Sequence, residues 1–319
     1  MSSPRFAAWK FSVALMVAGA GIASGADYPN KPIRIVTANP GGGSDFAARL
    51  IAQGISGPLG QPVIVENRGG LVTAEIASRA APDGYTMSLN GANLWVTTLL
   101  RKSPYDVLMD FAPISLLLRE VAIAAVNPSV PVRSINELIA MAKARPGELN
   151  LASDAPGGTS NLAGELFKSM AGVKIVNVPY KGAAAGITAL ISGEVQLMIV
   201  DAGLLAPHVK SGKLRALAVT SAEPTALAAG LPTVAASGLP GYEAVGMTGM
   251  FAPAKTPAAI INRLNREIVR MLNRPEVKEQ FFVRGSEVVA SSPAQFDAAI
   301  KADIARKSKV IKDAGIKLD

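Results

Sequence analysis

A glycine-rich turn near the start of the chain has the composition of an anion-binding site. The segment Asn39-Pro40-Gly41-Gly42-Gly43-Ser44-Asp45 lies between an apolar run at 33–37 and a segment at 46–55 with helical periodicity. Glycine allows the backbone to approach a ligand closely, and the first N–H groups of a helix have no partner inside it. The helix dipole adds partial positive charge at the same end. The pattern therefore predicts that residues 39–45 bind an anion through main-chain N–H groups.

A second turn of the same kind occurs at Ser153-Asp154-Ala155-Pro156-Gly157-Gly158-Thr159-Ser160. It precedes a segment with Leu162, Leu166 and Met170 at a helical spacing of four. Each turn alone is equally consistent with simple turn geometry, whereas two at matching positions favour a binding site. Hydrogen bonds to a charged group contribute about 1.5–3 kcal/mol each, and micromolar affinity needs about 8 kcal/mol. Several amides, together with closure around the ligand, could therefore hold a carboxylate without an arginine.

Three polar side chains at the ends of predicted strands are further candidate ligand contacts. Asn93 ends the turn that follows the third predicted strand. Asp45 is better explained as an N-cap of the following helix than as an acid that acts on a ligand. Asp201 follows an apolar strand-like run at 195–200. Its position is equally consistent with accepting a hydrogen bond from a ligand and with capping the next helix.

The remaining composition excludes several kinds of chemistry. The chain has no cysteine and one histidine, His208, which excludes thiolate catalysis, cysteine-ligated metals and multi-histidine metal sites. We interpret His208 as a surface or interface residue. The first glycine turn lacks the lysine of a phosphate-binding P-loop. We therefore expect no catalytic residue, no metal and no cofactor. Trp95 and Tyr180 either line the cleft or fill a core.

Residues 1–26 have the pattern of a secretory signal peptide. A positive segment with Arg5 and Lys10 precedes an apolar stretch, and the small residues that follow suit cleavage after Gly25 or Ala26. An uncleaved membrane anchor is the alternative, although the stretch is short for a span of about 20 residues. The signal predicts that the chain is secreted through the membrane. The net charge of +8 is spread along the chain and aromatic residues are 5% of it, so nucleic-acid binding is not expected.

Strand-like apolar runs alternate with helical segments along the mature chain. This alternation predicts an α/β protein with mixed, mostly parallel sheets and flanking helices. Two extended apolar runs, at 114–126 and 246–251, are interpreted as crossings between two lobes. Lobe 1 would comprise 27–125 plus 246–319, and lobe 2 would comprise 126–245. A double connection limits the relative motion of the lobes to a hinge, which suits closure around a ligand.

Short motifs distributed over the whole mature chain resemble those of one protein family. They are Tyr28-Pro29, Lys31-Pro32-Ile33, Gly41-Gly42-Gly43-Ser44-Asp45, Gly60-Gln61-Pro62-Val63, Val65-Glu66-Asn67-Arg68, Ala81-Pro82-Asp83-Gly84-Tyr85-Thr86, Leu162-Ala163-Gly164-Glu165-Leu166-Phe167, Val178-Pro179-Tyr180-Lys181-Gly182, Lys213–Thr220 and Leu231-Pro232-Thr233-Val234. In this order they are similar to the tripartite tricarboxylate transporter receptors, the Bug family. The resemblance implies a periplasmic solute-binding protein with the two-lobed type II, or Venus flytrap, fold. It also implies that main-chain groups and waters of Pro40–Asp45 and Ser153–Thr159 hold the ligand carboxylate.

The resemblance further implies a function and a set of partners. Such a receptor captures a small organic anion between its lobes and delivers it to the subunits of a membrane transporter, and we expect it to be a monomer. A receptor that senses the ligand for a membrane signalling partner is one alternative, and a hydrolytic enzyme on the same fold is another. The family usually has proline at Asn39, glycine near Ala155, serine or threonine at Gly158 and histidine at Asn161. These departures leave the identity of the carboxylate open.

Overall fold

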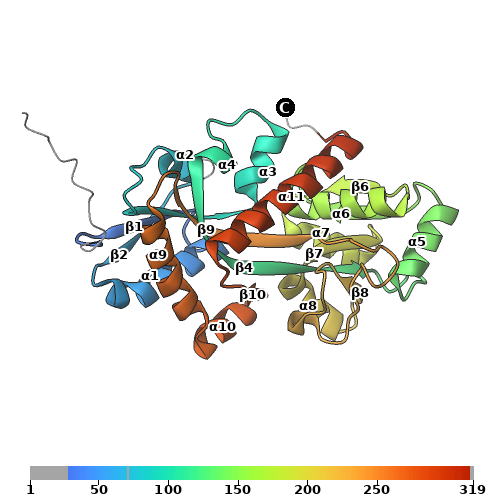
Figure 1. Cartoon of the computed structure of the whole chain (residues 1–319). Helices are drawn as coiled ribbons and strands as arrows, with labels where there is room; N and C mark the ends of the chain where they lie inside the picture. Colours follow the sequence, from blue (N-terminus) through green and yellow to red (C-terminus); the bar gives the residue numbers. More distant parts are fainter. Residues whose placement is uncertain (1–27, 70–71, 317–319) are drawn as a thin grey trace, which may run out of the picture.

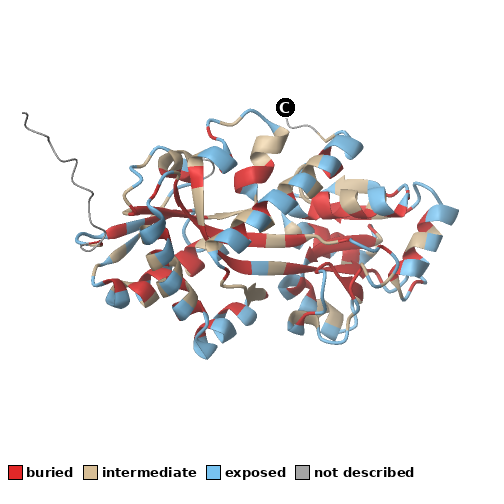
Figure 2. Ribbon diagram, in the orientation of Figure 1, coloured by how far each residue is buried: buried red, intermediate tan, exposed pale blue. Residues whose placement is uncertain are grey.

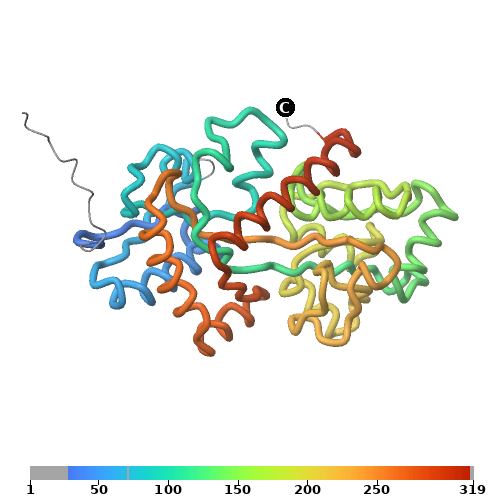
Figure 3. Tube along the Cα trace, in the orientation of Figure 1, coloured from blue at the N-terminus to red at the C-terminus, as the bar shows by residue number. Residues whose placement is uncertain are grey.

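Two lobes are joined by two long strands in the middle of the molecule. The computed structural model describes residues 28–69 and 72–316, and the predicted signal peptide at 1–26 lies outside the described residues. The connecting strands, β4 (Phe111–Val126) and β9 (Val245–Pro253), pair with each other and run side by side (Figure 1, Figure 3). They confirm the two crossings that the apolar runs predicted.

The lobe at the left of Figure 1 contains the first glycine turn. Its elements before the crossing are β1 (Ile33–Thr37), α1 (Gly43–Leu59), β2 (Val63–Asn67), α2 (Val72–Ser78), β3 (Thr86–Gly91), α3 (Asn93–Leu100) and α4 (Val107–Asp110). The chain returns to this lobe as α9 (Ala258–Leu272), α10 (Pro275–Phe282) and β10 (Ser286–Val288). β1 lies between β2 and β3 and is parallel to both. Ile33 and Ile35 of β1 are fully buried and pack with Ile51 and Ile55 of α1. The buried face of the strand, at a spacing of two, and that of the helix, at a spacing of four, therefore form one core.

The lobe at the right of Figure 1 contains the second glycine turn. Its elements are α5 (Ile135–Ala144), β5 (Asn150–Ser153), α6 (Thr159–Ala171), β6 (Val176–Pro179), α7 (Ala183–Ser192), β7 (Leu197–Asp201), α8 (Ala202–Lys210), β8 (Arg215–Val219) and the 3₁₀ helix η2 (Ala226–Ala228). Ser134 is the N-cap of α5, and its hydroxyl accepts a hydrogen bond from the Glu137 amide at 3.2 Å. α6 ends at Gly172, whose φ of 62° is the left-handed conformation that favours glycine.

The sheets are mixed, and the direction of pairing depends on the place in the fold. Within the lobes, β1 is parallel to β2 and β3, and β5 is parallel to β6 and β7. Every antiparallel pairing among the described residues includes β4 or β9. β4 pairs with β9 up to Val121 and with β7 from Ala122 onward. One continuous strand therefore belongs to the sheets of both lobes. Both glycine turns follow carboxyl ends of parallel strands, where α/β proteins bind ligands.

Helix α11 (Pro293–Ala314) runs over the middle of the molecule from one lobe toward the other (Figure 1). It begins with a capping box, in which Ser292 and Gln295 bond to each other's backbone. Its apolar face contacts β4 and α3 of the left lobe and α6 of the right lobe. Figure 2 shows the buried residues along the central strands and on the inward faces of the helices. The core is therefore continuous from each lobe into the connection.

The sequence analysis missed helix α3, and the structure explains why. Its sequence, NLWVTTLL, is apolar without a helical period and contains three β-branched residues, which are weak helix formers. Burial under α11 supplies the stabilisation that local propensity does not. Trp95 is fully buried there, and its indole N–H donates to the Asp303 carboxylate at 2.6 Å. Of the two roles that the sequence left open for Trp95, the structure therefore assigns the core.

Candidate ligand-binding site

Two neighbouring cavities lie where the lobes meet, and both are lined by Glu120 and Asp201. The first, of about 290 Å³, also includes Gly43 and Ser44 of the first glycine turn. The second, of about 260 Å³, includes Ser153, Asp154 and Thr159 of the second turn. The fold thus brings residues of both predicted turns and the predicted Asp201 to one cleft.

The other predicted contacts lie outside these two cavities. A third cavity, of about 440 Å³, is lined by Asn93, Gly157 and Gly158 and shares Thr159 with the second. The remaining predicted residues, which line none of the three cavities, are Asn39, Pro40, Gly41, Gly42 and Asp45. The first turn therefore reaches the cleft with Gly43 and Ser44 at the start of α1, and the second turn reaches it with Ser153 and Asp154 at its beginning and Thr159 at its end.

The first glycine turn presents free main-chain N–H groups at the start of α1. Gly42 is the N-cap residue and makes no side-chain hydrogen bond to the helix. Among the described residues, no acceptor is found for the amides of Gly42, Gly43 and Ser44. These are the unpaired donors that a helix N-terminus offers to an anion. Because Gly43 and Ser44 also line the cleft, this part of the sequence-based site has the geometry that anion binding requires.

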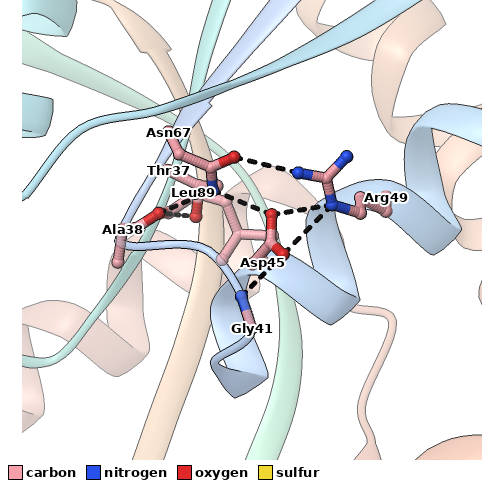
Figure 4. Close-up of polar contacts among 7 residues, drawn as sticks. All are labelled: Thr37, Ala38, Gly41, Asp45, Arg49, Asn67 and Leu89. Carbon is pink, nitrogen blue, oxygen red and sulfur yellow. Dashed lines mark hydrogen bonds and ion pairs between the residues drawn. The ribbon is translucent and has the colours of Figure 1, made fainter.

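Asp45 shapes this turn from inside α1. Its carboxylate accepts hydrogen bonds from the Gly41 amide and Arg49 Nε, both at 3.0 Å, and from Asn67 Nδ2 at 2.8 Å (Figure 4). The interpretation of Asp45 as the N-cap is wrong, since Gly42 is the N-cap and Asp45 lies in the first helical turn. The side chain instead ties the start of the turn to α1 and β2, because helix periodicity directs it back toward the preceding turn.

These contacts predict a pH-dependent contribution to stability. The hydrogen bond from Arg49, followed by that from Gly41, lowers the pKa of Asp45 from 3.8 to about 2. A carboxyl with a lowered pKa stabilises the folded state above its unfolded pKa and loses this contribution as the pH falls. We expect the free energy of unfolding of the wild type to fall relative to that of Asp45→Asn between about pH 4 and pH 2. Urea denaturation across this range checks it, and a constant difference between the two proteins would contradict it.

A carboxylate of the protein itself occupies the start of α6 in the second turn. Asp154 accepts hydrogen bonds from the amides of Asn161 at 2.8 Å and Ser160 at 3.3 Å. A negative side chain at this position compensates the positive end of the helix dipole. A ligand anion at the same amides would have to displace Asp154 and overcome its charge.

The glycine amides of the second turn are also hydrogen-bonded within the protein. The Gly157 amide donates to Asn161 Oδ1 at 3.0 Å, and the Gly158 amide donates to the Ala155 carbonyl at 2.9 Å. Among the described residues, no acceptor is found for the Thr159 amide. The two turns are therefore not equivalent in this conformation: the first offers several free donors to the cleft, and the second offers mainly Thr159.

Two acidic side chains of the cleft have perturbed titration. Glu120 lies in β4, and its Oε1 accepts a hydrogen bond from Thr248 Oγ1 at 2.9 Å. Burial, with a smaller contribution from Asp201, raises the pKa of Glu120 to about 7. Asp201 occupies the N-cap position of α8 but makes no side-chain hydrogen bond to that helix, so the capping alternative is wrong. Desolvation, followed by the Asp154 carboxylate, raises the pKa of Asp201.

Sequence reasoning missed two charged residues of the cleft, Glu120 and Arg284. The sequence could have indicated Glu120, because it interrupts a long, mostly apolar strand. A charged residue in a buried strand is rare unless it has a partner or a function. Arg284 follows α10 and lines the same cavity as Gly43, and its guanidinium lies 3.8 Å from the centre of the Phe46 ring. It makes no ion pair with the described acidic residues. Nothing in the local sequence distinguishes Arg284 from other surface arginines.

The described part of the chain contains no cluster of histidine, aspartate and glutamate side chains placed to hold a metal ion. It also contains no helix with the length and apolar character that crossing a bilayer requires. What the cleft does contain is a set of amides and one arginine on one side and carboxylates on the other. This arrangement suits reversible binding of a small polar molecule.

The chain is similar to known proteins over most of its length. Residues 47–316 match the family model described as the tripartite tricarboxylate transporter family receptor. The chain is 35% identical to Protein BugT of Bordetella pertussis over 316 residues, which cover 96% of this chain and 97% of BugT. It is also 35% identical to R. palustris Rpa4515, solved with adipate, with a TM-score of 0.73 and coverage of 91% and 99%. The periplasmic binding protein BugD is 30% identical, with a TM-score of 0.69 and coverage of 91% and 99%.

These similarities extend over nearly the whole chain and over both lobes. They confirm the two-lobed α/β fold that the sequence predicted. Proteins of this family are solute-binding receptors, so the predictions of a receptor and of a protein that is not an enzyme are also confirmed. The chain belongs to the tripartite tricarboxylate transporter receptor family.

Proposed function

We propose that this chain captures a small organic carboxylate between its lobes and delivers it to a membrane transporter. One observation carries the proposal: the free amides of Gly43 and Ser44 and the unpaired guanidinium of Arg284 line the same cavity. A carboxylate placed there would accept charge-assisted hydrogen bonds, which contribute about 1.5–3 kcal/mol each. The relative solved with adipate supports this class of ligand.

The proposed site retains the predicted residues in two different roles. Gly42, Gly43, Ser44 and Thr159 would donate their amides to the ligand. Asp201 and Asn93 would contact its polar groups from the edge of the cleft. The remaining predicted residues, Asn39, Pro40, Gly41, Asp45, Ser153, Gly157 and Gly158, would set the conformation of the two turns. Gly41 and Gly157 have φ values of 82° and 80°, which glycine adopts without strain.

We propose hinge closure about β4 and β9 as the mechanism of capture. The lobes would comprise 27–125 plus 246–319 and 126–245. In this conformation they touch at Gly203 and Gly285, where a Cβ on Gly203 would lie 3.3 Å from the Gly285 Cα. A side chain at Gly203 would require the backbone at Gly285 to move by a few tenths of an ångström. A ligand drives such closure only through its better binding to the closed state.

The location and the partners follow from the family and from the N-terminal pattern. We propose that residues 1–26 direct the chain to the periplasm and are cleaved after Gly25 or Ala26. The mature receptor would act as a monomer and present its closed form to the membrane subunits of the transporter. Membership of the transporter receptor family supports these steps.

A thermal-shift screen of the mature protein tests the proposal. The panel would contain mono-, di- and tricarboxylates, aromatic acids and amino acids, with adipate included because a relative was solved with it. A ligand that binds only the folded state raises the apparent melting temperature as its concentration rises. At least one acid should do so in the micromolar to millimolar range. A flat response across the whole panel would contradict the proposed function.

Arg284→Gln is expected to weaken binding of the best acid in this panel by about 10- to 100-fold, since one charge-assisted hydrogen bond is lost. Isothermal titration calorimetry would measure the change in Kd. Arg266→Gln, at an exposed position of α9 outside the cleft, makes the same change of charge and should leave the Kd within about twofold. Equal Kd values for wild type and Arg284→Gln would show that the ligand carboxylate does not contact this side chain.

A further inference from the structure

The charges of the cleft are distributed unevenly between its two sides. Arg284 and the free amides of Gly43 and Ser44 lie in the cavity on the side of the first lobe. Glu120 and Asp201 line this cavity and also the neighbouring one. The first cavity therefore contains positive groups and both acids, whereas the second contains the acids without an arginine, and a dicarboxylate that extends from Arg284 toward the second cavity would place one of its charges against protein carboxylates.

The register of the central sheet places the two acids together. Ala122 of β4 is paired with Asp201 of β7, and Glu120 lies two residues before Ala122 on β4. Alternate residues of a strand point to the same face, so the carboxylates of Glu120 and Asp201 leave the sheet on the same side. We refer to these two carboxylates as the Glu120–Asp201 pair.

The Glu120–Asp201 pair has acceptor capacity that the protein does not use. Thr248 donates to one oxygen of Glu120, and no donor among the described residues reaches its Oε2. Asp201 accepts no hydrogen bond and makes no ion pair with the described residues. Asp154, the third acid of the cleft, differs because its two oxygens accept from the amides of Ser160 and Asn161. The free oxygens facing the cleft thus belong to the Glu120–Asp201 pair.

Two carboxylates side by side without a cation are unfavourable, since each opposes ionisation of the other. Desolvation, with a smaller contribution from the Asp201 carboxylate, raises the pKa of Glu120 to about 7, and desolvation followed by the Asp154 carboxylate raises the pKa of Asp201. The charged or titratable groups that face the pair from neighbouring elements are Asp154, before α6, and Arg284, after α10. Neither forms an ion pair with it. A cationic ligand group placed between the two carboxylates would remove the repulsion.

We propose that the Glu120–Asp201 pair binds the ammonium group of a ligand whose carboxylate lies at Gly43, Ser44 and Arg284. The inference rests on the proposed function and narrows its ligand class to amino acids that carry the two charges at opposite ends. The dicarboxylate of equal length has no ammonium group to donate hydrogen bonds to the Glu120–Asp201 pair. It instead places a third negative charge beside the two carboxylates. The adipate bound by the R. palustris relative is therefore not the preferred type of ligand for this chain.

Matched ligand pairs of equal carbon number test the inference on the mature protein. They are 4-aminobutyrate with succinate, 5-aminopentanoate with glutarate and 6-aminohexanoate with adipate. Calorimetry at about pH 7.5 should give, in at least one pair, a Kd for the amino acid at least tenfold lower than that for the dicarboxylate, a difference of about 1.4 kcal/mol. The three lengths cover different separations of the two charges.

Two isosteric variants assign the preference to the Glu120–Asp201 pair. Glu120→Gln and Asp201→Asn should each reduce the preference for the amino acid at least tenfold, and dicarboxylate binding should become tighter because each variant removes one negative charge that opposes it. Glu148→Gln, at an exposed position after α5, removes an acid outside the cleft and should keep the wild-type preference. Lowering the pH to about 5.5 should also reduce the wild-type preference, because protonation of Glu120, whose pKa is about 7, removes a negative charge from the pair while the ligand ammonium stays charged.

The outcomes separate this inference from the proposed function. Tighter or equal binding of every dicarboxylate by the wild type would overturn the inference and keep the carboxylate receptor. A preference for the amino acid that both variants retain would also overturn it. If neither series nor any acid of the thermal-shift panel binds, the proposed function fails and the inference fails with it. Loss of the preference in either folded variant, or in the wild type at low pH, supports it.

Discussion

Gly43→Val is expected to abolish ligand binding while the protein remains folded. A Cβ at Gly43 meets no atom within 4 Å, and the residue lines the cleft, so the new side chain would occupy space intended for the ligand. Blocking two or three amide hydrogen bonds of about 1.5–3 kcal/mol each removes most of the roughly 8 kcal/mol of micromolar binding. We therefore expect Kd to rise at least 100-fold, measured by calorimetry with the best acid of the thermal-shift panel.

Gln53→Val is the matched control for this change. It introduces the same side chain at an exposed position of the same helix, outside the cleft, and should leave Kd unchanged. Circular dichroism would show that both variants retain the fold. The corresponding change at Gly157 is not equivalent, because Gly157 has a positive φ and its Cβ would lie 2.4 Å from Leu100 Cδ1. Wild-type affinity in folded Gly43→Val would place the ligand away from the first glycine turn.

Asp303→Ala is expected to cost about 3–5 kcal/mol of unfolding free energy, because it removes one partner of a buried charged network. Asp303 is 4% exposed in α11, accepts from the buried Trp95 indole at 2.6 Å and pairs with Lys307 at 2.6 Å. The variant would leave the indole N–H without an acceptor in a dry core. The Trp95–Asp303 hydrogen bond also holds α3 against α11, and α11 is the helix that contacts both lobes. Guanidinium denaturation would measure the change.

Asp297→Ala is the control for Asp303→Ala, because it removes an ion pair of the same spacing from the same helix. Asp297 contacts Lys301 at 2.7 Å, but both side chains are exposed. Its loss should cost at most about 0.5 kcal/mol. Asp303→Asn, which keeps an acceptor for the indole, should fall between the two. A cost below about 1 kcal/mol for Asp303→Ala would show that the Trp95 contact contributes little to stability.

The parts of the fold that the sequence predicted well are those with strong local patterns. The two crossing strands have long apolar runs, and the first glycine turn directly precedes a helix. Both patterns act over a few residues, so they can be read without the partners that complete them. Helix α3 was missed because its apolar residues are not confined to one narrow face, so the sequence has no clear helical period. The buried face is defined only by the packing of α11 against it.

In the site, the sequence identified the turns but assigned their atoms only in part. The glycine spacing at 41–43 correctly indicated a helix start with free amides. The similar spacing at 157–158 did not reveal that the side chains of Asp154 and Asn161 accept hydrogen bonds from main-chain amides at that turn. Whether a side chain folds back on its own turn depends on rotamers and on neighbouring charges, and glycine spacing contains neither.

The sequence by itself determined the family, the two-lobed fold class and the helix start with free amides at the first turn, because these depend on residue types at short, fixed spacings. Only the tertiary structure decided which side chains share the cleft. Arg284 lies more than two hundred positions from Gly43, and Glu120 about eighty from Asp201, yet each of these residues lines the same cavity. The proximity of residues so far apart in the sequence follows from strand register and from the return of the chain to the first lobe. Local sequence does not encode either of them.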